Sequence, residues 1–221
     1  MKVSVLLPIK RFSASKQRLA PFLSAAVREA LALAMTRDVM NALTQAARIS
    51  DITVLTCDPA AIEVVRPFGV RIIADDMDSG HNRAAAAGIR NVRAAGAANV
   101  MMVPIDVPLI TGPEIDAVVE AHSTRPQALT IVPSRDGSGT NCTLASPPGL
   151  VEPLFGPGSF KLYCDAARAA GADLRVVQSR GLGLDIDTPD DIEMFLRTGR
   201  STHTSAILAD ALHRGKVAAS P

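Results

Sequence analysis

The chain has 221 residues, of which 48% are hydrophobic, 20% charged and 3% aromatic. This composition lets it bury a substantial core and excludes disordered and fibrous proteins. Its 23 Lys and Arg residues balance 22 Asp and Glu residues to a formal net charge of +1, so no overall field attracts nucleic acid or an anionic membrane.

Short runs of β-branched and apolar residues alternate with longer alanine-rich stretches. This alternation is typical of strands and helices that build a mainly parallel sheet flanked by helices, so we predict an α/β fold. The run 100–105 is apolar throughout, as expected of a central strand buried on both faces. The predicted strands span residues 3–7, 52–56, 70–74, 99–105, 128–133 and 174–178.

Capping signals mark the helices between these strands. Ser24 is a plausible N-cap, Pro113 suits a first helical turn, and Gly96, Gly171 and Gly199 follow predicted helix ends. Residues 1–199 are expected to form a single domain, followed by a peripheral, frayed tail, 200–221, with one helical candidate at 206–213. The other predicted helices span residues 24–47, 82–95, 113–122, 158–170 and 190–197.

The loop after the first strand is rich in cations. Lys10, Arg11, Lys16 and Arg18 fall within nine positions, and ligands of open α/β sheets bind at the carboxyl ends of the strands. The Lys16 ammonium and the Arg18 guanidinium suit an anion such as a triphosphate. The loop lacks the glycines of a Walker A motif, and the alternative is a solvated basic loop without a ligand.

Two acidic segments also follow predicted strands. Asp106 ends the apolar run of the fourth strand, while Asp185 and Asp187 alternate and point the same way if the chain is extended there. Mg²⁺ takes one or two carboxylates together with phosphate oxygens and waters, so these residues could share one ion. Alternatively, Asp106 caps a turn and Asp187 is the N-cap of the helix at 190–197.

Three loops of small residues could contact ligands. The turn 78–82 opens a helix and offers backbone N–H groups and the Asn82 amide to a base or ribose. Loops 137–141 and 155–159 could hold a phosphate or carboxylate of a second substrate, or could simply be ordinary turns. The four histidines have no metal-ligand spacing and no supporting nucleophile motif, so none is assigned to catalysis.

The cysteine pattern and the N-terminus bear on the compartment. Cys57, Cys142 and Cys164 form no CxxC pair, which favours a reducing cytosol. The apolar run 3–7 ends too early for a signal peptide, and no run approaches a membrane span. We therefore expect a cytoplasmic protein, mature from its first residue, with no membrane or nucleic-acid partner.

Several of these motifs resemble one known family. Over residues 1–197, in order, the chain is similar to the guanylyltransferases of coenzyme F420 biosynthesis. This resemblance implies the Rossmann-like fold of the nucleotide-diphospho-sugar transferases, with GTP and Mg²⁺ over the carboxyl edge of the sheet. The motifs that carry the resemblance are Leu-Pro-Ile-Lys at 7–10, Ser-Lys-Gln-Arg-Leu at 15–19, Gly-His-Asn at 80–82, Pro-Ile-Asp-Val-Pro at 104–108, Gly-Thr-Asn at 139–141 and Asp-Ile-Asp-Thr-Pro at 185–189.

The resemblance also implies a reaction and a set of site residues. The family transfers GMP from GTP to the phosphate of a small phospho-acid and releases pyrophosphate. His81 departs from it, since an apolar residue such as Leu is expected there. The residues that match the family's functional positions are Asp106 and Asp187 for the metal, with Asp185 adjacent; Lys10, Lys16 and Arg18 in the basic loop; Gly80 and Asn82 in the nucleotide-binding turn; and Thr140, Gly156 and Ser159 for the phospho-acid.

The acceptor is the least specified part of this prediction. The chain resembles most the branch that uses 3-phospho-D-glycerate, ahead of 2-phospho-L-lactate and phosphoenolpyruvate. Two other functions stay open: a cytidylyl- or molybdenum-cofactor-type nucleotidyltransferase of the same fold, and a non-catalytic nucleotide-binding regulator. A homodimer is expected from the frequency of that arrangement among soluble proteins.

Overall fold

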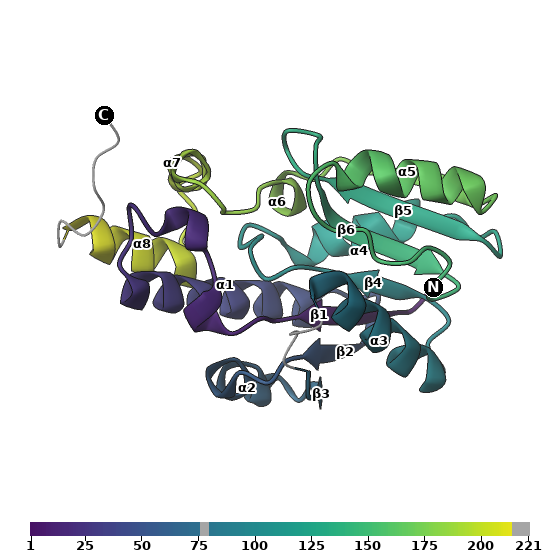
Figure 1. Ribbon diagram of the computed structural model, residues 1–221, viewed down its shortest axis with the longest axis horizontal. Helices are drawn as coiled ribbons and strands as arrows, with labels where there is room; N and C mark the ends of the chain where they lie inside the picture. The colour runs from purple at the N-terminus through teal and green to yellow at the C-terminus, as the bar shows by residue number, and fades with distance from the viewer. Residues whose placement is uncertain (76–79, 214–221) are drawn as a thin grey trace.

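The computed structural model describes residues 1–75 and 80–213, and within them seven strands form one sheet (Figure 1). The strand order is β3-β2-β1-β4-β6-β5-β7. β6 runs antiparallel to both of its neighbours, and the remaining pairs are parallel, which confirms the predicted mainly parallel sheet. The strands are β1 (Val3–Pro8), β2 (Ile49–Leu55), β3 (Arg71–Ile73), β4 (Val100–Met102), β5 (Ala128–Pro133), β6 (Thr140–Ser146) and β7 (Asp173–Val176).

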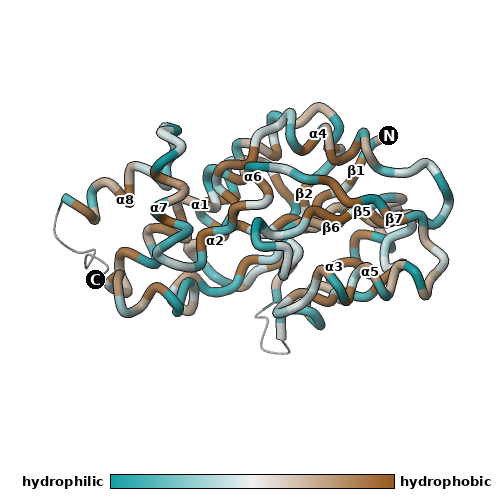
Figure 2. The backbone as a smooth tube through the Cα atoms, turned by 90° about the horizontal axis from the view of Figure 1, so that it is seen from above, coloured by the Kyte–Doolittle hydropathy of each residue, from teal (hydrophilic) through white to brown (hydrophobic). Residues whose placement is uncertain are grey.

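Helices cover both faces of this sheet. Figure 2 shows the hydrophobic strands running between α3 and α5 on one side and α4 on the other. Short 3-10 helices lie at Phe12–Ala14, Gln17–Leu19 and Arg66–Phe68. The helices are α1 (Ala25–Gln45), α2 (Pro59–Val65), α3 (His81–Ala94), α4 (Gly112–Ala121), α5 (Ser159–Ala169), α6 (Arg180–Gly183), α7 (Pro189–Arg197) and α8 (His203–His213).

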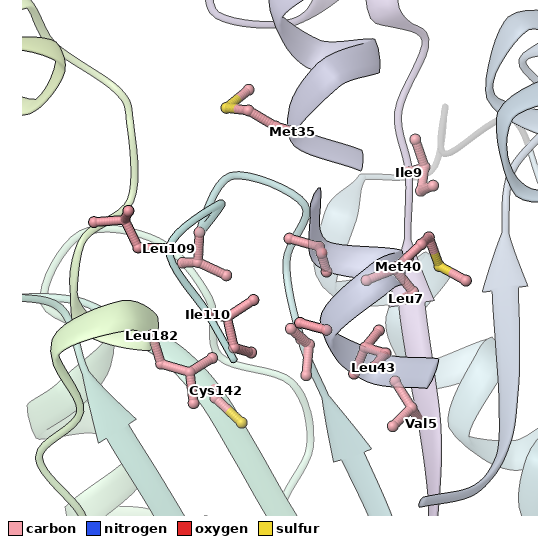
Figure 3. Close-up of a cluster of buried hydrophobic side chains, with 14 of the residues drawn as sticks. Val5, Leu7, Ile9, Met35, Met40, Leu43, Leu109, Ile110, Cys142 and Leu182 are labelled. Carbon is pink, nitrogen blue, oxygen red and sulfur yellow. The ribbon is translucent and has the colours of Figure 1, made fainter. Parts of the chain in front are cut away.

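Side chains on the two faces of β1 pack into two different core clusters. Val5 and Leu7 pack with Met40 and Leu43 of α1 (Figure 3), whereas the intervening Leu6 packs against α3. All six residues of β1 are buried, as a parallel strand with helices on both sides requires. The core thus fixes β1 and β4 at the middle of the sheet, where their carboxyl ends lead into the loops that hold Lys16 and Asp106.

Three sheet elements differ from the sequence prediction by three residues or more, and one of them is β2, which begins at Ile49 rather than at 52. The fourth strand ends at Met102 rather than at 105, because Pro104 has no N–H to donate to a neighbouring strand. β6 was missed, since its Thr140, Asn141 and Thr143 resemble loop residues although they are buried between β4 and β5.

The tail also differs from expectation over its described part. α8 lies along α1 (Figure 1), with Leu208 fully buried in the core. The carboxylate of Asp38 on α1 accepts hydrogen bonds from the backbone N–H groups of His203 and Thr204, at 2.9 and 2.8 Å, and so caps the start of α8. Residues 203–213 therefore form an ordered helix packed against α1 and not a frayed segment. The prediction of frayed ends for 214–221 lies outside the described residues.

None of the helices in the described ranges is long and apolar enough to cross a membrane. The longest, α1, buries its apolar side chains against the sheet and α8 instead.

Candidate active site

The loop after β1 is held in a defined shape over the carboxyl edge of the sheet. The backbone N–H of the buried Phe12 donates to the Asp58 carboxylate at 2.6 Å, which ties the loop to the start of α2. Lys16 has φ of 53°, and it is the one non-glycine residue with positive φ in the described ranges. That conformation costs about 1–2 kcal/mol for a residue with a Cβ, so it persists here because the surrounding contacts hold it.

Lys16 joins two aspartates that are far apart in the sequence. Its ammonium donates to Asp106 Oδ2 at 2.8 Å and to Asp187 Oδ1 at 2.7 Å. Arg18 adds a longer contact of 3.4 Å to Asp187 Oδ2. The structure therefore brings the predicted basic loop and both predicted strand-end aspartates into one ion cluster, which we call the Lys16 cluster (Lys16, Arg18, Asp106 and Asp187).

The charges of this cluster stabilise one another. Burial opposes the charge on the Lys16 ammonium, but attraction to Asp106 and Asp187 outweighs it and raises the pKa of Lys16. Burial likewise opposes the charge on Asp187, yet the neighbouring Lys16 and Arg18 lower the pKa of its carboxyl group. Lys16 is thus a cation and Asp187 an anion throughout the neutral pH range.

Asp187 is free for this role because another residue caps α7. The N-cap is Thr188, whose hydroxyl accepts from Asp191 N–H, while the Asp191 carboxylate accepts from the N–H groups of Thr188 and Asp187 at 2.8 and 3.1 Å. The alternative that Asp187 itself caps the helix is therefore wrong. The N–H of Ile186 donates to the Asp106 carbonyl at 2.9 Å, which aligns the two acidic segments.

Asp185 lies apart from the ammonium of Lys16. Its Oδ1 accepts from the Asn141 amide at 3.0 Å, and the same amide donates to the Leu182 carbonyl at 2.8 Å. Burial and the nearby Asp106 charge raise the pKa of Asp185, although the bond from Asn141 opposes the shift. The structure therefore separates the two alternating aspartates: Asp187 faces Lys16, and Asp185 is held by β6.

Two adjoining clefts meet at this cluster. We call them the Lys10 cleft, of about 560 Å³, and the Thr140 cleft, of about 470 Å³. Both are lined by Arg18, Phe155, Gly156 and Asp187. The Lys10 cleft is also lined by Lys10, Lys16, His81 and Asp106. The Thr140 cleft is also lined by Arg135, Ser138, Thr140, Asn141, Ser159 and Asp185.

Most of the predicted site residues line one of these two clefts. Lys10 and Lys16 lie on one side, and the predicted phospho-acid residues Thr140, Gly156 and Ser159 lie on the other. The hydroxyl of Thr140 is buried and has no hydrogen-bond partner in the protein, which makes it a candidate partner for a ligand or a water. A larger cavity of about 810 Å³ opens at the amino ends of β2 and β4, away from the charged cluster and from the strand ends where such folds bind ligands.

The predicted nucleotide turn borders the Lys10 cleft through His81. Gly80 and Asn82 are absent from the described residues that line either cleft, whereas His81 lines the Lys10 cleft. The His81 ring contacts Phe155 edge-on, at 5.6 Å between ring centroids. Its Nδ1 is buried without a partner, and burial together with Lys10 lowers the pKa of the ring. Residues 78 and 79 of this turn lie outside the described ranges.

Sequence reasoning missed Arg135, and it included Asn141 and Phe155 only as members of the loops 137–141 and 155–159, without a role of their own. Arg135 lines the Thr140 cleft and pairs with Asp191 at 3.5 Å. Asn141 holds Asp185, and Phe155 borders both clefts. The Asp-Gly pair at 136–137 is a recognisable turn signal beside Arg135, but no local signal marks Phe155 because its partners come from distant segments.

The donor set fits a divalent cation of the Mg²⁺ type. Oxygens of Asp106 and Asp187 bond to the same ammonium nitrogen, so they are at most two hydrogen-bond lengths apart. In residues 1–75 and 80–213, no three His, Cys, Asp or Glu side chains gather into a complete metal cage. Two carboxylates completed by phosphate oxygens and waters is the arrangement that Mg²⁺ usually takes in nucleotide sites.

Comparisons with known proteins find relatives over most of the chain. The model of a family described as "Guanylyl transferase CofC like" matches residues 3–213, which includes α8. The phosphoenolpyruvate guanylyltransferase of Conexibacter woesei is 34% identical over 96% of this chain and 97% of its own. The protein of the same name from Mycolicibacterium smegmatis is 32% identical over 94% of this chain and 91% of its own.

Solved structures show the same fold at low identity. A Desulfovibrio desulfuricans protein provisionally described as a nucleotide-diphospho-sugar transferase superposes with a TM-score of 0.76 at 15% identity, covering 96% of both chains. A nucleotidyl transferase from Methanothermobacter gives 0.64 at 17% identity, covering 89% of this chain and 99% of its own. These likenesses confirm the nucleotide-diphospho-sugar transferase fold predicted from the sequence.

Proposed function

The chain belongs to the CofC-like guanylyl transferases and is a nucleotidyltransferase, and from this premise we propose that it transfers GMP from GTP to the phosphate of a small phospho-acid in coenzyme F420 biosynthesis. Pyrophosphate is the second product. The observation that carries the proposal is the Lys16 cluster, which stands between two clefts of a size suited to two small anionic substrates.

GTP is assigned to the Lys10 cleft and the phospho-acid to the Thr140 cleft. Lys10 and Lys16 face the first cleft, where the triphosphate carries the larger negative charge. The second cleft offers the Arg135 guanidinium and the unpaired Thr140 hydroxyl, which suit a phosphate or carboxylate oxygen. Arg18 borders both clefts, so we expect it to contact both substrates.

The chemistry needs no covalent enzyme intermediate. An oxygen of the acceptor phosphate forms a bond to the α-phosphorus of GTP, and the bond from that phosphorus to pyrophosphate breaks. A phosphate monoester is largely dianionic near neutral pH, since its second pKa is about 6, so no general base is required. The task of the protein is to hold two polyanions against their repulsion, which Lys16, Arg18 and Arg135 do.

We further propose that Asp106 and Asp187 hold Mg²⁺, with Asp185 beside them. When bound, the ion supplies Lewis-acid stabilisation of charge at the reacting phosphate. Lys16 bonds to the same two carboxylates, so with Mg²⁺ held by them its ammonium would be available to the phosphates of GTP. A homodimer also stays a prediction, which light scattering of the purified protein would check.

The proposed acceptor is a three-carbon phospho-carboxylic acid. The curated relatives are named for phosphoenolpyruvate, so this acid is our first candidate. The preference for 3-phospho-D-glycerate, which the sequence resemblance favoured, becomes the second, and 2-phospho-L-lactate the third. All three present a carboxylate close to a phosphate, which matches the cationic and hydroxyl groups of the Thr140 cleft.

The test is a panel of the three acids with GTP and Mg²⁺, read by pyrophosphate release and by the mass of the guanylylated product. We expect turnover with GTP and with one acid above the others. Turnover with CTP and none with GTP would assign a cytidylyltransferase instead. GTP binding without pyrophosphate release from any of the three acids would assign a non-catalytic nucleotide-binding regulator.

A further inference from the structure

The side-chain amide of Asn82 is engaged with the backbone of a residue 73 positions away. Its Nδ2 donates to the Phe155 carbonyl at 3.0 Å, and its Oδ1 accepts from the Phe155 N–H at 3.0 Å. The Asn82 amide thus bonds to both the N–H and the carbonyl of Phe155, as the backbone of a paired strand does. It ties the first turn of α3 to the segment 155–159, which lines the Thr140 cleft.

Segment 155–159 depends on such external contacts for its shape. Gly156 and Gly158 have φ of 130° and 70°, and glycine loses the most conformational freedom when it is ordered. On the side away from Asn82, the N–H of Phe160 donates to the Ser138 carbonyl at 3.4 Å. Asn82 is therefore the side chain that fixes the entry to this segment, immediately before Gly156 and Ser159.

The Phe155 ring extends the same connection to the nucleotide side. It contacts His81 edge-on at 5.6 Å and Tyr163 edge-on at 5.5 Å between ring centroids. Tyr163 in turn accepts a hydrogen bond from the Leu154 N–H at 3.0 Å. Phe155 is thus held from α3 and from α5, and it borders both clefts.

We infer that Asn82 is a positioning residue for the phospho-acid, acting through Phe155, and not a group that reads the base or ribose of GTP. Among the described residues that line the two clefts, Asn82 is absent while Phe155 and Gly156 are present. The inference rests on the proposed function, because it takes the Thr140 cleft as the acceptor site. It changes the role that the sequence resemblance gave to Asn82.

The direct test is Asn82→Ala, assayed for the KM of each substrate in turn. Loss of both hydrogen bonds leaves the segment to be ordered by the phospho-acid itself, so we expect the KM of the acid to rise about 10-fold or more. The KM of GTP should rise by less than that of the acid, because Pro157 and Ser159 of the segment line only the Thr140 cleft, whereas Phe155 and Gly156 line both clefts. A rise in the KM of GTP as large as that of the acid, or no change in either, overturns the inference.

Two further variants make the test specific. Asn82→Asp is isosteric and still accepts from Phe155 N–H, but it cannot donate to the Phe155 carbonyl, so it should show the same selective rise while keeping the fold. Asn91→Ala is the matched control: this exposed asparagine on the far part of α3 pairs with Arg71. Asn91→Ala should leave both KM values unchanged, and a selective rise there would contradict the role of Asn82.

A substrate-free measurement separates this inference from the proposed function. Hydrogen exchange of the Phe155 amide should be about 10-fold faster in Asn82→Ala than in the unmodified protein, because the acceptor of that N–H is gone. If no acid is turned over with GTP, the proposed function fails, but the exchange rate still reports on the hydrogen bonds between Asn82 and Phe155. Unchanged exchange at Phe155, or faster exchange with an unchanged KM for the acid, refutes the positioning role.

Discussion

Replacing Lys16 with methionine tests whether the Lys16 cluster is held together by charge. The change keeps the length of the side chain but removes the ammonium that bonds to Asp106 at 2.8 Å and to Asp187 at 2.7 Å. Two carboxylates then face each other with only the longer contact of Arg18 to Asp187, at 3.4 Å, left to compensate. The variant should therefore be less stable than the unmodified protein in the absence of substrates.

The magnitude follows from how deeply each partner is buried. Removing one partner of a fully buried ion pair costs about 3–5 kcal/mol. The Lys16 side chain is 6% exposed, but Asp106 is 24% and Asp187 35% exposed, so water screens part of the repulsion. We expect a loss of about 2–3 kcal/mol, or a fall in Tm of about 5–10 °C for a protein of this length.

The pH dependence of this loss has a defined sign. The pKa of Asp187 is lowered in the folded protein, so its contribution is present above the unfolded value near about 3.9 and disappears as the pH falls through the folded value. The pKa of Lys16 is raised, so its contribution is present below about 10.4 and disappears as the pH rises further. The difference in stability between the two proteins should be largest between about pH 5 and 10.

The assay is urea and thermal unfolding of both proteins, with and without Mg²⁺. Lys161→Met is the matched control, because this lysine is 82% exposed and pairs with Asp165 on the surface of α5; it should lose less than about 1 kcal/mol. Mg²⁺ should raise the Tm of Lys16→Met more than that of the unmodified protein, since the two carboxylates are then free. Equal stability of Lys16→Met and the unmodified protein near pH 7 would refute the reasoning.

Three other changes follow from particular contacts. Asp106→Asn should lower turnover by at least about 100-fold while Lys16 stays paired with Asp187 and the fold is kept; turnover within a few-fold of normal would remove Asp106 from the reaction. In α6, a Cβ at Gly181 would lie 2.5 Å from Glu114 Oε2 and 2.7 Å from the Leu109 carbonyl, while one at Gly183 would meet its nearest atom at 3.8 Å. Urea unfolding should therefore show a loss of about 1–3 kcal/mol for Gly181→Ala and a much smaller one for Gly183→Ala, and equal losses would contradict the contacts. Burial raises the pKa of Cys142 to about 12, so iodoacetamide at pH 8 should label the partly exposed Cys57 first; peptide mass spectrometry that finds Cys142 labelled equally fast in folded protein would oppose this.

The sequence predicts the architecture well where one segment carries its own signal. The apolar runs of β1 and β5, the N-cap Ser24 and the first-turn Pro113 lie where the pattern places them. The sequence does not predict β6, because the residues of β6 are mostly polar and their burial depends on β4 and β5 on either side. The sequence predicts that α8 is peripheral, because its cap, Asp38, lies 165 residues earlier and no local pattern shows it.

The candidate site shows the same division between local and distant information. Position along the chain left Asp106 and Asp187 open as metal ligands or caps, the family resemblance assigned both to one metal site, and the structure brings both to Lys16. Alternation was not enough to place Asp185, because Asn141 of the unpredicted β6 holds its carboxylate away from Lys16. The role of Asn82 depends on a partner 73 residues away, which no local pattern reveals.

The central claim is that two anionic substrates occupy adjoining clefts on either side of the Lys16 cluster. A crystal structure with a non-hydrolysable GTP analogue, Mg²⁺ and phosphoenolpyruvate tests it most directly. We predict the nucleotide phosphates beside Lys10 and Lys16, with the acid beside Arg135 and Thr140. A nucleotide bound in the large cavity at the amino ends of β2 and β4, or both molecules confined to one cleft, would contradict the account.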